Sequence, residues 1–372
     1  MRIAIEAQRI FRKHKHGMDF VVLETIRALQ QLDRNNEYFI LVRPGEDRCL
    51  QETGNFYIVE INCPTYFLWE QVALPLSLHR IKPDLVHCTS NTAPLYCPYT
   101  LVLTLHDIIF LEKKKGDTRS LYQRLGRIYR RWVIPRVIPI CRLIITVSDY
   151  ERTRIQKSFS LDTNTIITIH NGSSPDFNPF RKDPSIVRKY ILEKAYLFFL
   201  GNTDPKKNTA GTLKAYGIYL RESRRKLPLL IADLKESVID SLLAKEGLTD
   251  IKPHLYYPGY IPNSDLPYVY SGAFAFLYPS LRESFGLPIL EAMASGVPVV
   301  SSRTSAIPEV AGEGALLVDP FDPEAIARQL IELEENSIYY QEQVTYGLTH
   351  SQLFSWEKTA EKILQTYLSL SL

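Results

Sequence analysis

The segment from Phe274 to Val300 constrains the fold of this chain more than any other. Phe274 to Tyr278 is a short apolar and aromatic run, which is typical of a buried strand. Ser280 to Gly286 is polar and is predicted to be a loop. Pro288 suits the first turn of a helix, because its φ angle is already helical and its missing N–H needs no partner there.

The end of the predicted helix is equally well marked. Gly296 suits a left-handed residue that closes a helix, and Pro298 prevents the helix from continuing. Val297 to Val300 then begins another apolar strand. The whole segment therefore predicts a strand, loop, helix and strand of an open α/β sheet, with the loop and the helix start at the carboxyl end of a strand.

The predicted helix start can bind an anion. Backbone N–H groups around Ser284 to Leu287 have no partner within the helix, and the helix dipole adds positive charge there, which favours a phosphate. Two carboxylates frame the same place, Glu283 on the loop and Glu291 in the first turn. Carboxylates accept hydrogen bonds from hydroxyls, so a ligand with both phosphates and hydroxyls, such as a nucleotide sugar, fits both features. The alternative is a solvated helix start in which glutamate merely complements the dipole.

Length and composition predict a two-domain globular enzyme. The chain has 372 residues, more than one typical core accommodates. Hydrophobic residues make up 45% and charged residues 23%, and the net charge of +3 is too small to indicate a nucleic-acid partner. No spacing of cysteine or histidine suggests a metal site, and none is expected.

Basic residues are nevertheless concentrated in the first half. They form three groups: Arg12, Lys13, Lys15 and His16; Lys113 to Lys115; and the arginine-rich stretch from Arg119 to Arg136. An anionic membrane surface is one explanation and a pyrophosphate-bearing acceptor is another. A solvated face is the third, so peripheral membrane association through this basic domain stays one of three alternatives.

The cysteines and the N-terminus predict a cytoplasmic protein, at the inner face of the membrane if the basic groups bind lipid. Five cysteines without a CxxC spacing are expected to be reduced and mostly buried. The first residues form a predicted strand rather than a signal peptide, and no stretch has the roughly 18 to 20 apolar residues of a spanning helix. The cysteines are Cys49, Cys63, Cys88, Cys97 and Cys141.

Glu283 and Glu291 are separated by seven residues within Glu-Ser-Phe-Gly-Leu-Pro-Ile-Leu-Glu-Ala-Met-Ala-Ser-Gly-Val-Pro-Val-Val. This segment resembles the EX7E signature of the retaining glycosyltransferases of the GT4 family. The resemblance extends over nearly the whole chain and is strongest over 254–320. It implies the GT-B fold, an α/β architecture of two facing Rossmann-like domains with the active site in the cleft between them.

The resemblance also implies how the chain is divided. Residues 1–178 are expected to form the acceptor-binding domain, completed by a C-terminal helix over 354–372. Residues 185–353 are expected to bind the nucleotide sugar. The linker is placed near 175–185, where prolines interrupt the pattern.

The same resemblance indicates two candidate site residues in the first domain. Gly17 precedes a predicted helix, where family members place a glycine-bearing loop against the donor diphosphate; an ordinary loop glycine is the alternative. His106 follows a strand over 100–105, where many members hold a histidine near the transferred sugar. Asp107 is expected to orient its neighbour or the following loop.

The segment from Phe67 to Leu78 is predicted to be one helix.

The second domain repeats the phosphate-binding pattern. Gly201 follows a predicted strand, and Lys206 and Lys207 precede a helix, so amides and ammonium groups can share a phosphate. Family members often have an arginine where this chain has Asn202, so either Lys206 compensates or donor binding differs. Ile261 lies where the family contacts the nucleobase through backbone groups.

The roles of the helix-start residues follow from the family. Glu291 is implied to hold the ribose hydroxyls, and Glu283 to bind sugar hydroxyls and stabilise the developing oxocarbenium ion. The amides of Ser284, Phe285 and Gly286 are implied to neutralise the departing diphosphate. No metal cofactor is implied.

The resemblance implies a hexose donor with GDP or UDP, and mannose is the first choice. Three segments resemble mannosyltransferase-like members: Trp69 to Gln71, Leu105 to Asp107, and Asp204 to Asn208. The expected acceptor is a saccharide or a lipid-linked saccharide of cell-surface polysaccharide or lipopolysaccharide. Two alternatives remain, a nucleotide-sugar epimerase of the same fold and a catalytically silent nucleotide-sugar-binding module.

Overall fold

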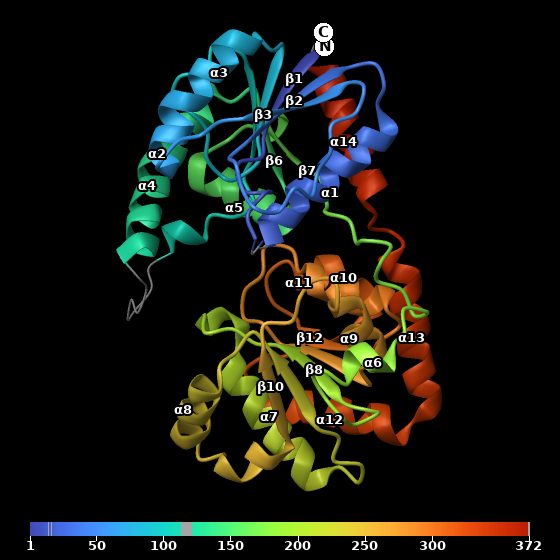
Figure 1. The fold of residues 1–372 in the computed structure, drawn as a ribbon. Coiled ribbons are helices and arrows are strands. Elements are labelled where there is room, and N and C mark those ends of the chain that lie inside the picture. Colours follow the sequence, from blue (N-terminus) through green and yellow to red (C-terminus); the bar gives the residue numbers. More distant parts are fainter. Residues whose placement is uncertain (14, 16, 113–120, 371–372) are drawn as a thin grey trace. The chain divides into compact units, whose positions relative to one another are not determined.

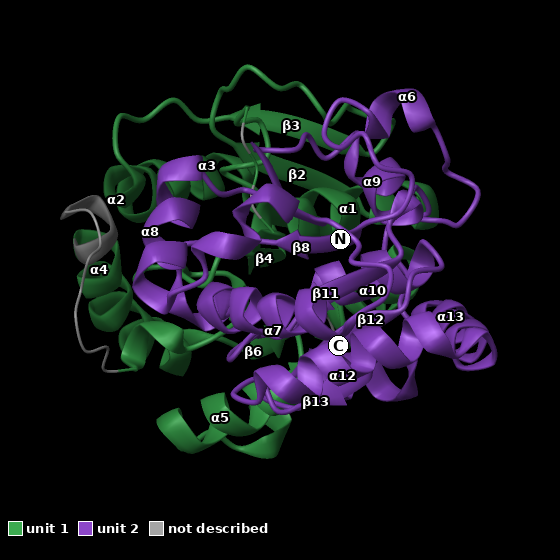
Figure 2. Ribbon diagram, turned by 90° about the horizontal axis from the view of Figure 1, so that it is seen from below, with its two compact units in different colours: residues 1–172, 356–372 green, residues 173–355 purple. Residues whose placement is uncertain are grey.

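The computed structural model describes residues 1–370 except 14, 16 and 113–120. The chain divides into two compact units, coloured green and purple in Figure 2. Unit 1 comprises Met1–Gly172 and Trp356–Leu372, and unit 2 comprises Ser173–Ser355. The sequence places the linker a few residues later, near 175–185, because the prolines there mark an irregular chain rather than the last contact of unit 1.

Unit 1 is built on a seven-stranded parallel sheet with the strand order β3-β2-β1-β4-β5-β6-β7 (Figure 1). The strands are β1 (Arg2–Glu6), β2 (Glu37–Val42), β3 (Phe56–Glu60), β4 (Leu85–Cys88), β5 (Thr100–Thr104), β6 (Leu143–Thr146) and β7 (Ile166–Thr168). The α-helices are α1 (Gly17–Leu32), α2 (Tyr66–Leu68), α3 (Leu74–Ile81), α4 (Leu121–Val137), α5 (Asp149–Phe159) and α14 (Trp356–Ser369). Short 3₁₀ helices cover Ile109–Leu111, Ile138–Ile140 and Thr163–Thr165, and a π-helix covers Trp69–Ala73.

The strands of unit 1 are mostly apolar because helices cover both faces of a parallel sheet. Successive side chains point to opposite faces. Val86 of β4 packs in one core with Trp69 and with Val133 of α4. The next residue, His87, points to the other face, which α1 and α14 cover (Figure 1).

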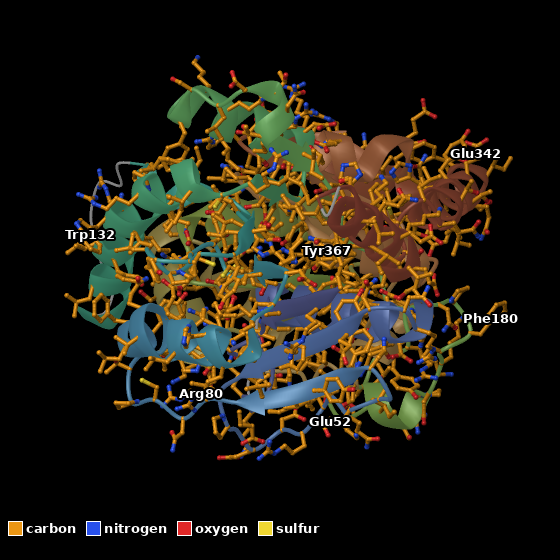
Figure 3. All side chains as sticks on the ribbon, turned by 90° about the horizontal axis from the view of Figure 1, so that it is seen from above. Glu52, Arg80, Trp132, Phe180, Glu342 and Tyr367 are labelled. Atoms are coloured by element: carbon orange, nitrogen blue, oxygen red, sulfur yellow. The ribbon has the colours of Figure 1, made fainter. Side chains whose placement is uncertain are left out.

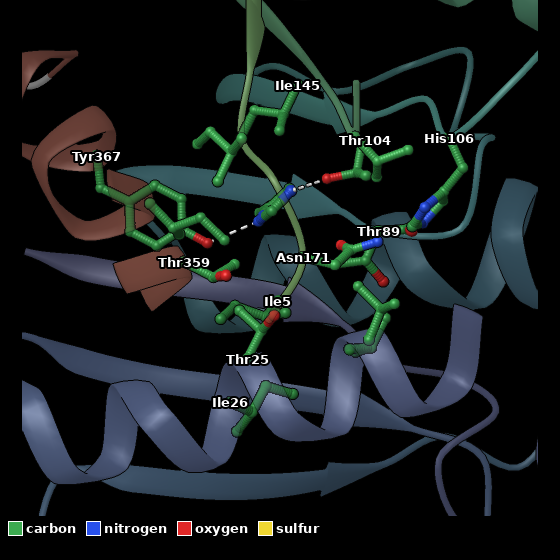
Figure 4. Close-up of a pocket in the computed structure, with 16 residues that line it drawn as sticks. Ile5, Thr25, Ile26, Thr89, Thr104, His106, Ile145, Asn171, Thr359 and Tyr367 are labelled. Carbon is green, nitrogen blue, oxygen red and sulfur yellow. Dashed lines mark hydrogen bonds between the residues drawn. The ribbon is translucent and has the colours of Figure 1, made fainter. Parts of the chain in front are cut away.

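His87 is a buried histidine that ties α14 to the sheet. Its Nδ1 is 2.6 Å from the Tyr367 hydroxyl and its Nε2 is 2.7 Å from Thr104 Oγ1 (Figure 4). Burial lowers the pKa of His87 to about 3, so the imidazole is neutral at physiological pH. A small cavity of about 30 Å³ lies beside it, lined in part by Thr25 and Thr359.

Replacing Tyr367 with phenylalanine is expected to lower the free energy of unfolding of unit 1 by about 1–3 kcal/mol, because His87 Nδ1 loses its buried partner. All three tryptophans of the chain lie in unit 1, so fluorescence during urea unfolding follows this unit. Tyr346→Phe, at a side chain of unit 2 that is 48% exposed, is the control and should change nothing. If Tyr367→Phe were as stable as the wild type, the hydrogen bond between His87 and Tyr367 would not stabilise unit 1 as proposed.

Unit 2 has a six-stranded parallel sheet with the order β10-β9-β8-β11-β12-β13. The strands are β8 (Leu197–Leu200), β9 (Leu229–Ala232), β10 (Leu255–Gly259), β11 (Ala275–Tyr278), β12 (Val299–Ser302) and β13 (Leu316–Val318). The α-helices are α6 (Pro184–Val187), α7 (Thr209–Glu222), α8 (Glu236–Glu246), α9 (Leu266–Gly272), α10 (Leu287–Ala294), α11 (Ile307–Ala311), α12 (Pro323–Glu335) and α13 (Ser337–Ser351). Short 3₁₀ helices cover Pro205–Lys207, Thr249–His254 and Gly312–Gly314.

The segment from Phe274 to Val300 folds as predicted, into β11, α10 and β12. Gly296 has φ +73° just after α10, the left-handed ending expected of it. The helix begins at Leu287, one residue before Pro288. Glu291 is therefore the fifth helical residue and lies in the second turn, not in the first turn as predicted.

Two further features of the fold differ from the predictions. The expected helix over 67–78 is interrupted by the π-helix Trp69–Ala73, which inserts an extra residue into the turn that buries Glu70. Only Cys88 is fully buried, and the other four free cysteines are partly exposed. They lie in loops and at the ends of elements, where a small side chain meets a core without being enclosed.

Among the residues that the structure describes, no helix combines the length and the apolar character required to cross a bilayer.

Candidate functional site

Strands β8 and β11 are neighbours at the centre of the sheet of unit 2, where the strand order reverses. Connections leave such a point in opposite directions, so the loops at the two carboxyl ends form the usual ligand site of an open α/β sheet. The loop after β8 carries Gly201 to Asn208, and the loop after β11 carries Pro279 to Gly286. The backbone N–H of Leu281 donates to the carbonyl oxygen of Lys206 at 2.7 Å, which fastens the two loops together.

The two loops bring Lys207 and Glu283 into an ion pair. Lys207 Nζ donates to Glu283 Oε1 at 2.7 Å, and the two side chains are only 19% and 10% exposed. Lys207 Nζ also donates to the Tyr278 hydroxyl and lies 4.7 Å from the centre of that ring. The backbone N–H of Glu283 donates to Ser305 Oγ at 2.9 Å, so both ends of the glutamate are fixed.

The ion pair keeps Glu283 ionised. Burial by itself would raise the pKa of this carboxyl, but the charges of Lys207 and Lys206 and the hydrogen bond from Lys207 outweigh burial and hold it below the usual range. At neutral pH the site thus offers a fixed carboxylate and a fixed ammonium group side by side. The first can accept a hydroxyl hydrogen bond or stabilise a cation, and the second can bind a phosphate oxygen.

Glu291 has a different environment. Its Oε2 accepts a hydrogen bond from the Tyr270 hydroxyl at 3.1 Å. Burial raises the pKa of Glu291 to about 7, because the hydrogen bond from Tyr270 offsets the effect of burial only in part. The two glutamates of the motif therefore differ in charge near neutral pH, a pattern that is common where carboxyl groups serve different purposes.

The start of α10 is shaped by Gly286. This residue has φ +114°, a backbone conformation that disfavours any side chain, and a Cβ there would lie 3.3 Å from Ile289 Cδ1. Phe285 is 4% exposed and packs edge-on against Phe354, with ring centres 6.0 Å apart. The chain thus enters the helix at a fixed angle, with the amides of Ser284 to Leu287 at its positive end.

Three further predicted donor residues lie at the carboxyl ends of β8 and β10. Asn202 Oδ1 accepts from the backbone N–H of Asp204 at 2.8 Å, so this side chain stabilises the turn before Lys206 and Lys207. Gly201 is required by packing, because a Cβ there would lie 2.5 Å from Leu234 Cδ1. Ile261 is buried two residues beyond β10.

Replacing Lys207 with methionine is expected to lower the free energy of unfolding of unit 2 by about 3 kcal/mol at pH 7, because Glu283 is left buried without its counter-charge. The lowered pKa of Glu283 means that the pair stabilises the fold above pH 4.5, the carboxyl's usual pKa, and that this stabilisation is lost as the pH falls further. The deficit should therefore shrink toward pH 4. Calorimetry at both pH values measures it.

The double variant Lys207→Met/Glu283→Gln is the matched control for this prediction. It removes both charges and should recover most of the lost stability at pH 7. A double variant that is no more stable than Lys207→Met alone would show that the lysine acts through packing rather than through its charge.

In unit 1, His106 lies at the carboxyl end of β5 and is 5% exposed. Its Nε2 donates to the carbonyl oxygen of Thr89 at 3.0 Å, and its backbone N–H donates to Asn91 Oδ1 at 2.6 Å. Burial lowers the pKa of His106, so the ring is neutral with its proton on Nε2. Asp107 Oδ1 accepts from the backbone N–H of Ile109 at 3.0 Å, so it orients the following loop, as predicted.

Two buried glutamates, neither of them predicted as a site residue, hold the loop next to His106. Glu6 Oε2 accepts from the backbone N–H of Thr89 at 3.2 Å. Glu70 accepts from the hydroxyls of Thr92, Tyr66 and Tyr129. Burial raises the pKa of Glu70, although its hydrogen bonds oppose this. The signal available in the sequence was a glutamate in an otherwise apolar, aromatic segment.

Gly17 is the first residue of α1, and no described atom lies within 4 Å of a Cβ built there. Packing among the described residues therefore does not require a glycine at this position. The neighbouring basic group is partly neutralised, since Arg12 pairs with Asp19 and Lys15 with Asp47. His16, Lys113 to Lys115 and Arg119 lie outside the described residues.

Over the residues that the structure describes, no three His, Cys, Asp or Glu side chains gather closely enough to hold a metal ion.

Two protein families match the chain, one in each unit. The family described as "Glycosyltransferase Family 4" matches residues 16–177. The family described as "Glycosyl transferases group 1" matches residues 185–350, which include both loops and both glutamates of the site in unit 2.

The relatives include mannosyltransferases. The "O-antigen chain mannosyltransferase B" of Escherichia coli is 33% identical over 283 residues, which are 73% of this chain and 72% of that protein. The "Serotype-specific mannosyltransferase WbdA" of Escherichia coli is 24% identical over 322 residues, which are 81% of this chain but only 38% of that longer protein.

Among solved structures, the fold is similar to that of Anabaena Alr3699/HepE, whose crystal structure contains UDP and glucose. The TM-score is 0.71 and the sequence identity 17%, covering 99% of this chain and 100% of the other. A likeness at this identity shows the fold alone.

Proposed function

Because this chain belongs to glycosyltransferase family 4 and is a glycosyltransferase of the GT-B fold, we propose that it transfers mannose from a nucleotide-diphosphate sugar to an acceptor hydroxyl with retention of configuration. The observation that supports this most is the meeting of Lys207, Glu283 and the α10 start at one point of unit 2. Phosphate, sugar and ribose each have a suitable partner there.

The proposed chemistry follows from where charge develops. When the bond between sugar and phosphate breaks, negative charge grows on the diphosphate and positive charge on the sugar ring. The amides of Phe285 and Gly286 and the ammonium group of Lys207 can stabilise the leaving diphosphate, and Glu283 can stabilise the sugar cation. Glu291 accepts hydrogen bonds from the ribose hydroxyls once its carboxyl is ionised.

In the proposal, unit 1 provides the remaining groups. His106 contacts the transferred sugar, and Gly17 allows the donor diphosphate to approach the backbone. His106 Nε2 already donates to the carbonyl oxygen of Thr89, so Nδ1 carries no proton and can act only as an acceptor from a sugar hydroxyl.

Mannose is proposed because a relative with 33% identity over most of both chains is named an O-antigen chain mannosyltransferase. That name also favours a saccharide or lipid-linked saccharide acceptor in cell-surface polysaccharide assembly, and hence a cytoplasmic enzyme at the inner face of the membrane. Which of GDP and UDP carries the sugar is left to the test. The reaction is proposed to need no metal, since Lys207 and the helix amides provide the positive charge at the diphosphate.

The test is a thermal-shift and turnover screen of GDP-mannose, UDP-glucose, UDP-galactose and UDP-N-acetylglucosamine, each in the presence of EDTA. GDP-mannose is expected to stabilise the protein most and to be turned over with an α-linked product. Conversion of a donor without any acceptor would indicate an epimerase, and binding of every donor without turnover would indicate a silent binding module. Either outcome would overturn the proposal.

A further inference from the structure

Helix α4 exposes a row of large apolar side chains. Leu125 and Ile128 are 61% and 63% exposed, and Trp132 follows one turn later with 44% exposed. The spacing of three and four residues places the three side chains on one face of the helix. The opposite face, with Val133 and Val137, is buried in the core of unit 1. Figure 3 shows Trp132 on the outer side of α4.

A second exposed row lies on the neighbouring helical segment. Leu68, Val72 and Leu76 recur every four residues along α2, the π-helix and α3, and Leu76 is 60% exposed. The two helical segments touch where Phe67 packs edge-on against Tyr129 of α4, with ring centres 5.7 Å apart. We call the two rows together with Phe67 the α4 surface. Exposed apolar side chains gathered on neighbouring elements in this way usually mark an interaction site.

Positive charge borders the α4 surface. Arg131 and Arg136 are exposed on either side of the row on α4, and the helix sequence contains no Asp or Glu. Arg136 donates to the carbonyl oxygen of Trp132 at 2.8 Å and its guanidinium lies 4.8 Å from the centre of the indole ring. An exposed tryptophan with apolar neighbours and flanking arginines is the composition of a helix that lies in the interface of an anionic bilayer.

We propose that the α4 surface docks unit 1 onto an anionic lipid bilayer, with Ile128 and Trp132 inserted among the acyl chains and Arg131 and Arg136 at the lipid phosphates. This deepens the proposed function, because it names the surface through which a membrane-bound acceptor is reached. It differs from the basic group around Arg12, whose partners Asp19 and Asp47 lie within the protein. The docking itself needs neither donor nor acceptor.

A second copy of the chain is the competing occupant. An interface between identical copies would place the arginines of one α4 opposite those of the other, and no acidic side chain of α4 is present to offset them. A bilayer with anionic headgroups satisfies both the apolar row and its positive border. The charges therefore favour lipid.

Trp132 provides a direct readout of docking. Of the three tryptophans, Trp69 and Trp356 are 1% and 7% exposed, so a change on adding vesicles comes from Trp132. The full chain is mixed with vesicles of phosphatidylcholine alone or with added phosphatidylglycerol. We expect a blue shift and quenching by brominated acyl chains only with the anionic vesicles, and sedimentation with them that weakens as salt is added.

Two variants and a control separate the contributions. Ile128→Ser/Trp132→Ser should reduce sedimentation with anionic vesicles at least tenfold. Arg131→Glu/Arg136→Glu should reduce sedimentation with anionic vesicles by a similar factor at low salt, and the remaining sedimentation should no longer depend on salt. Ile338→Ser/Tyr346→Ser removes two exposed apolar side chains from α13 of unit 2 and should bind as the wild type does.

Three results would overturn the inference: no preference of the wild type for anionic vesicles, wild-type sedimentation of Ile128→Ser/Trp132→Ser, or a dimer in gel filtration that this variant abolishes. The assay contains no sugar nucleotide. A wild-type protein that turns over the donor but does not bind vesicles therefore refutes the docking alone. A protein that binds anionic vesicles but turns over no donor refutes the proposed reaction alone.

Discussion

Replacing Glu283 with glutamine is expected to lower kcat about a thousandfold, while the Kd of the nucleoside diphosphate changes by less than about threefold. The substitution keeps the shape of the side chain but removes the negative charge that faces the developing sugar cation. Nucleotide affinity is largely kept because Lys207 and the α10 amides are unchanged. Lys207, released from its partner at 2.7 Å, is even freer to bind phosphate.

Steady-state rates and calorimetric titration with GDP and UDP measure the two effects separately. Glu313→Gln, at an exposed glutamate of unit 2, is the control and should behave as the wild type. If Glu283→Gln kept more than about a tenth of the wild-type kcat, the carboxylate would not stabilise the transition state as proposed.

Replacing Glu291 with glutamine is expected to stabilise the free protein at high pH and to weaken donor binding. The pKa of Glu291 is raised to about 7 by burial, so the protonated form favours the fold: this stabilisation is complete below pH 4.5 and is lost as the pH rises through 7. The variant cannot ionise. It should match the wild type near pH 5 and exceed its free energy of unfolding by about 2–3 kcal/mol at pH 8.

The affinity for the donor should fall in the same variant. A carboxylate that accepts hydrogen bonds from two ribose hydroxyls forms charge-assisted hydrogen bonds, so its loss should weaken binding of the nucleoside diphosphate about a hundredfold at pH 8. Wild-type affinity should itself rise as the pH passes through 7 and Glu291 ionises, and this pH dependence should vanish in the variant.

Thermal denaturation and titration calorimetry at pH 5 and pH 8 measure both halves of this prediction. Tyr270→Phe is the companion variant, because it removes the hydroxyl that donates to Glu291 at 3.1 Å but keeps the carboxylate. It should cost less affinity than Glu291→Gln. A Glu291→Gln variant with full donor affinity would show that Glu291 does not hold the ribose.

The parts of the fold that the sequence predicted correctly have local causes. Pro288, Gly296 and Pro298 restrict the backbone at their own positions, so the strand, loop and helix over 274–300 could be placed without knowing the rest of the chain.

What the sequence could not predict depends on residues that are far apart along the chain. Lys207 and Glu283 are 76 positions apart, and Glu70 and Tyr129 are 59 apart. Periodicity carries no information on such pairs, because they arise only when neighbouring strands are ordered in a sheet. The π-helix at Trp69 to Ala73 was also not predicted, and it buries Trp69 and Glu70.

The predicted site residues stand at different levels of support. In the structure, Lys207, Glu283 and Lys206 lie together at the carboxyl ends of β8 and β11. Gly201 and Asn202 stabilise the turn that follows β8. Their roles toward a donor, like those of Gly17, His106 and Ile261, remain predictions that donor binding has to test.

A crystal structure of the chain with bound GDP or UDP tests the central claim most directly. The account predicts the diphosphate within hydrogen-bonding distance of the Phe285 and Gly286 amides and of Lys207 Nζ, with the ribose hydroxyls on Glu291. A nucleotide bound at another place, with the start of α10 unoccupied and Lys207 still paired with Glu283, would contradict it.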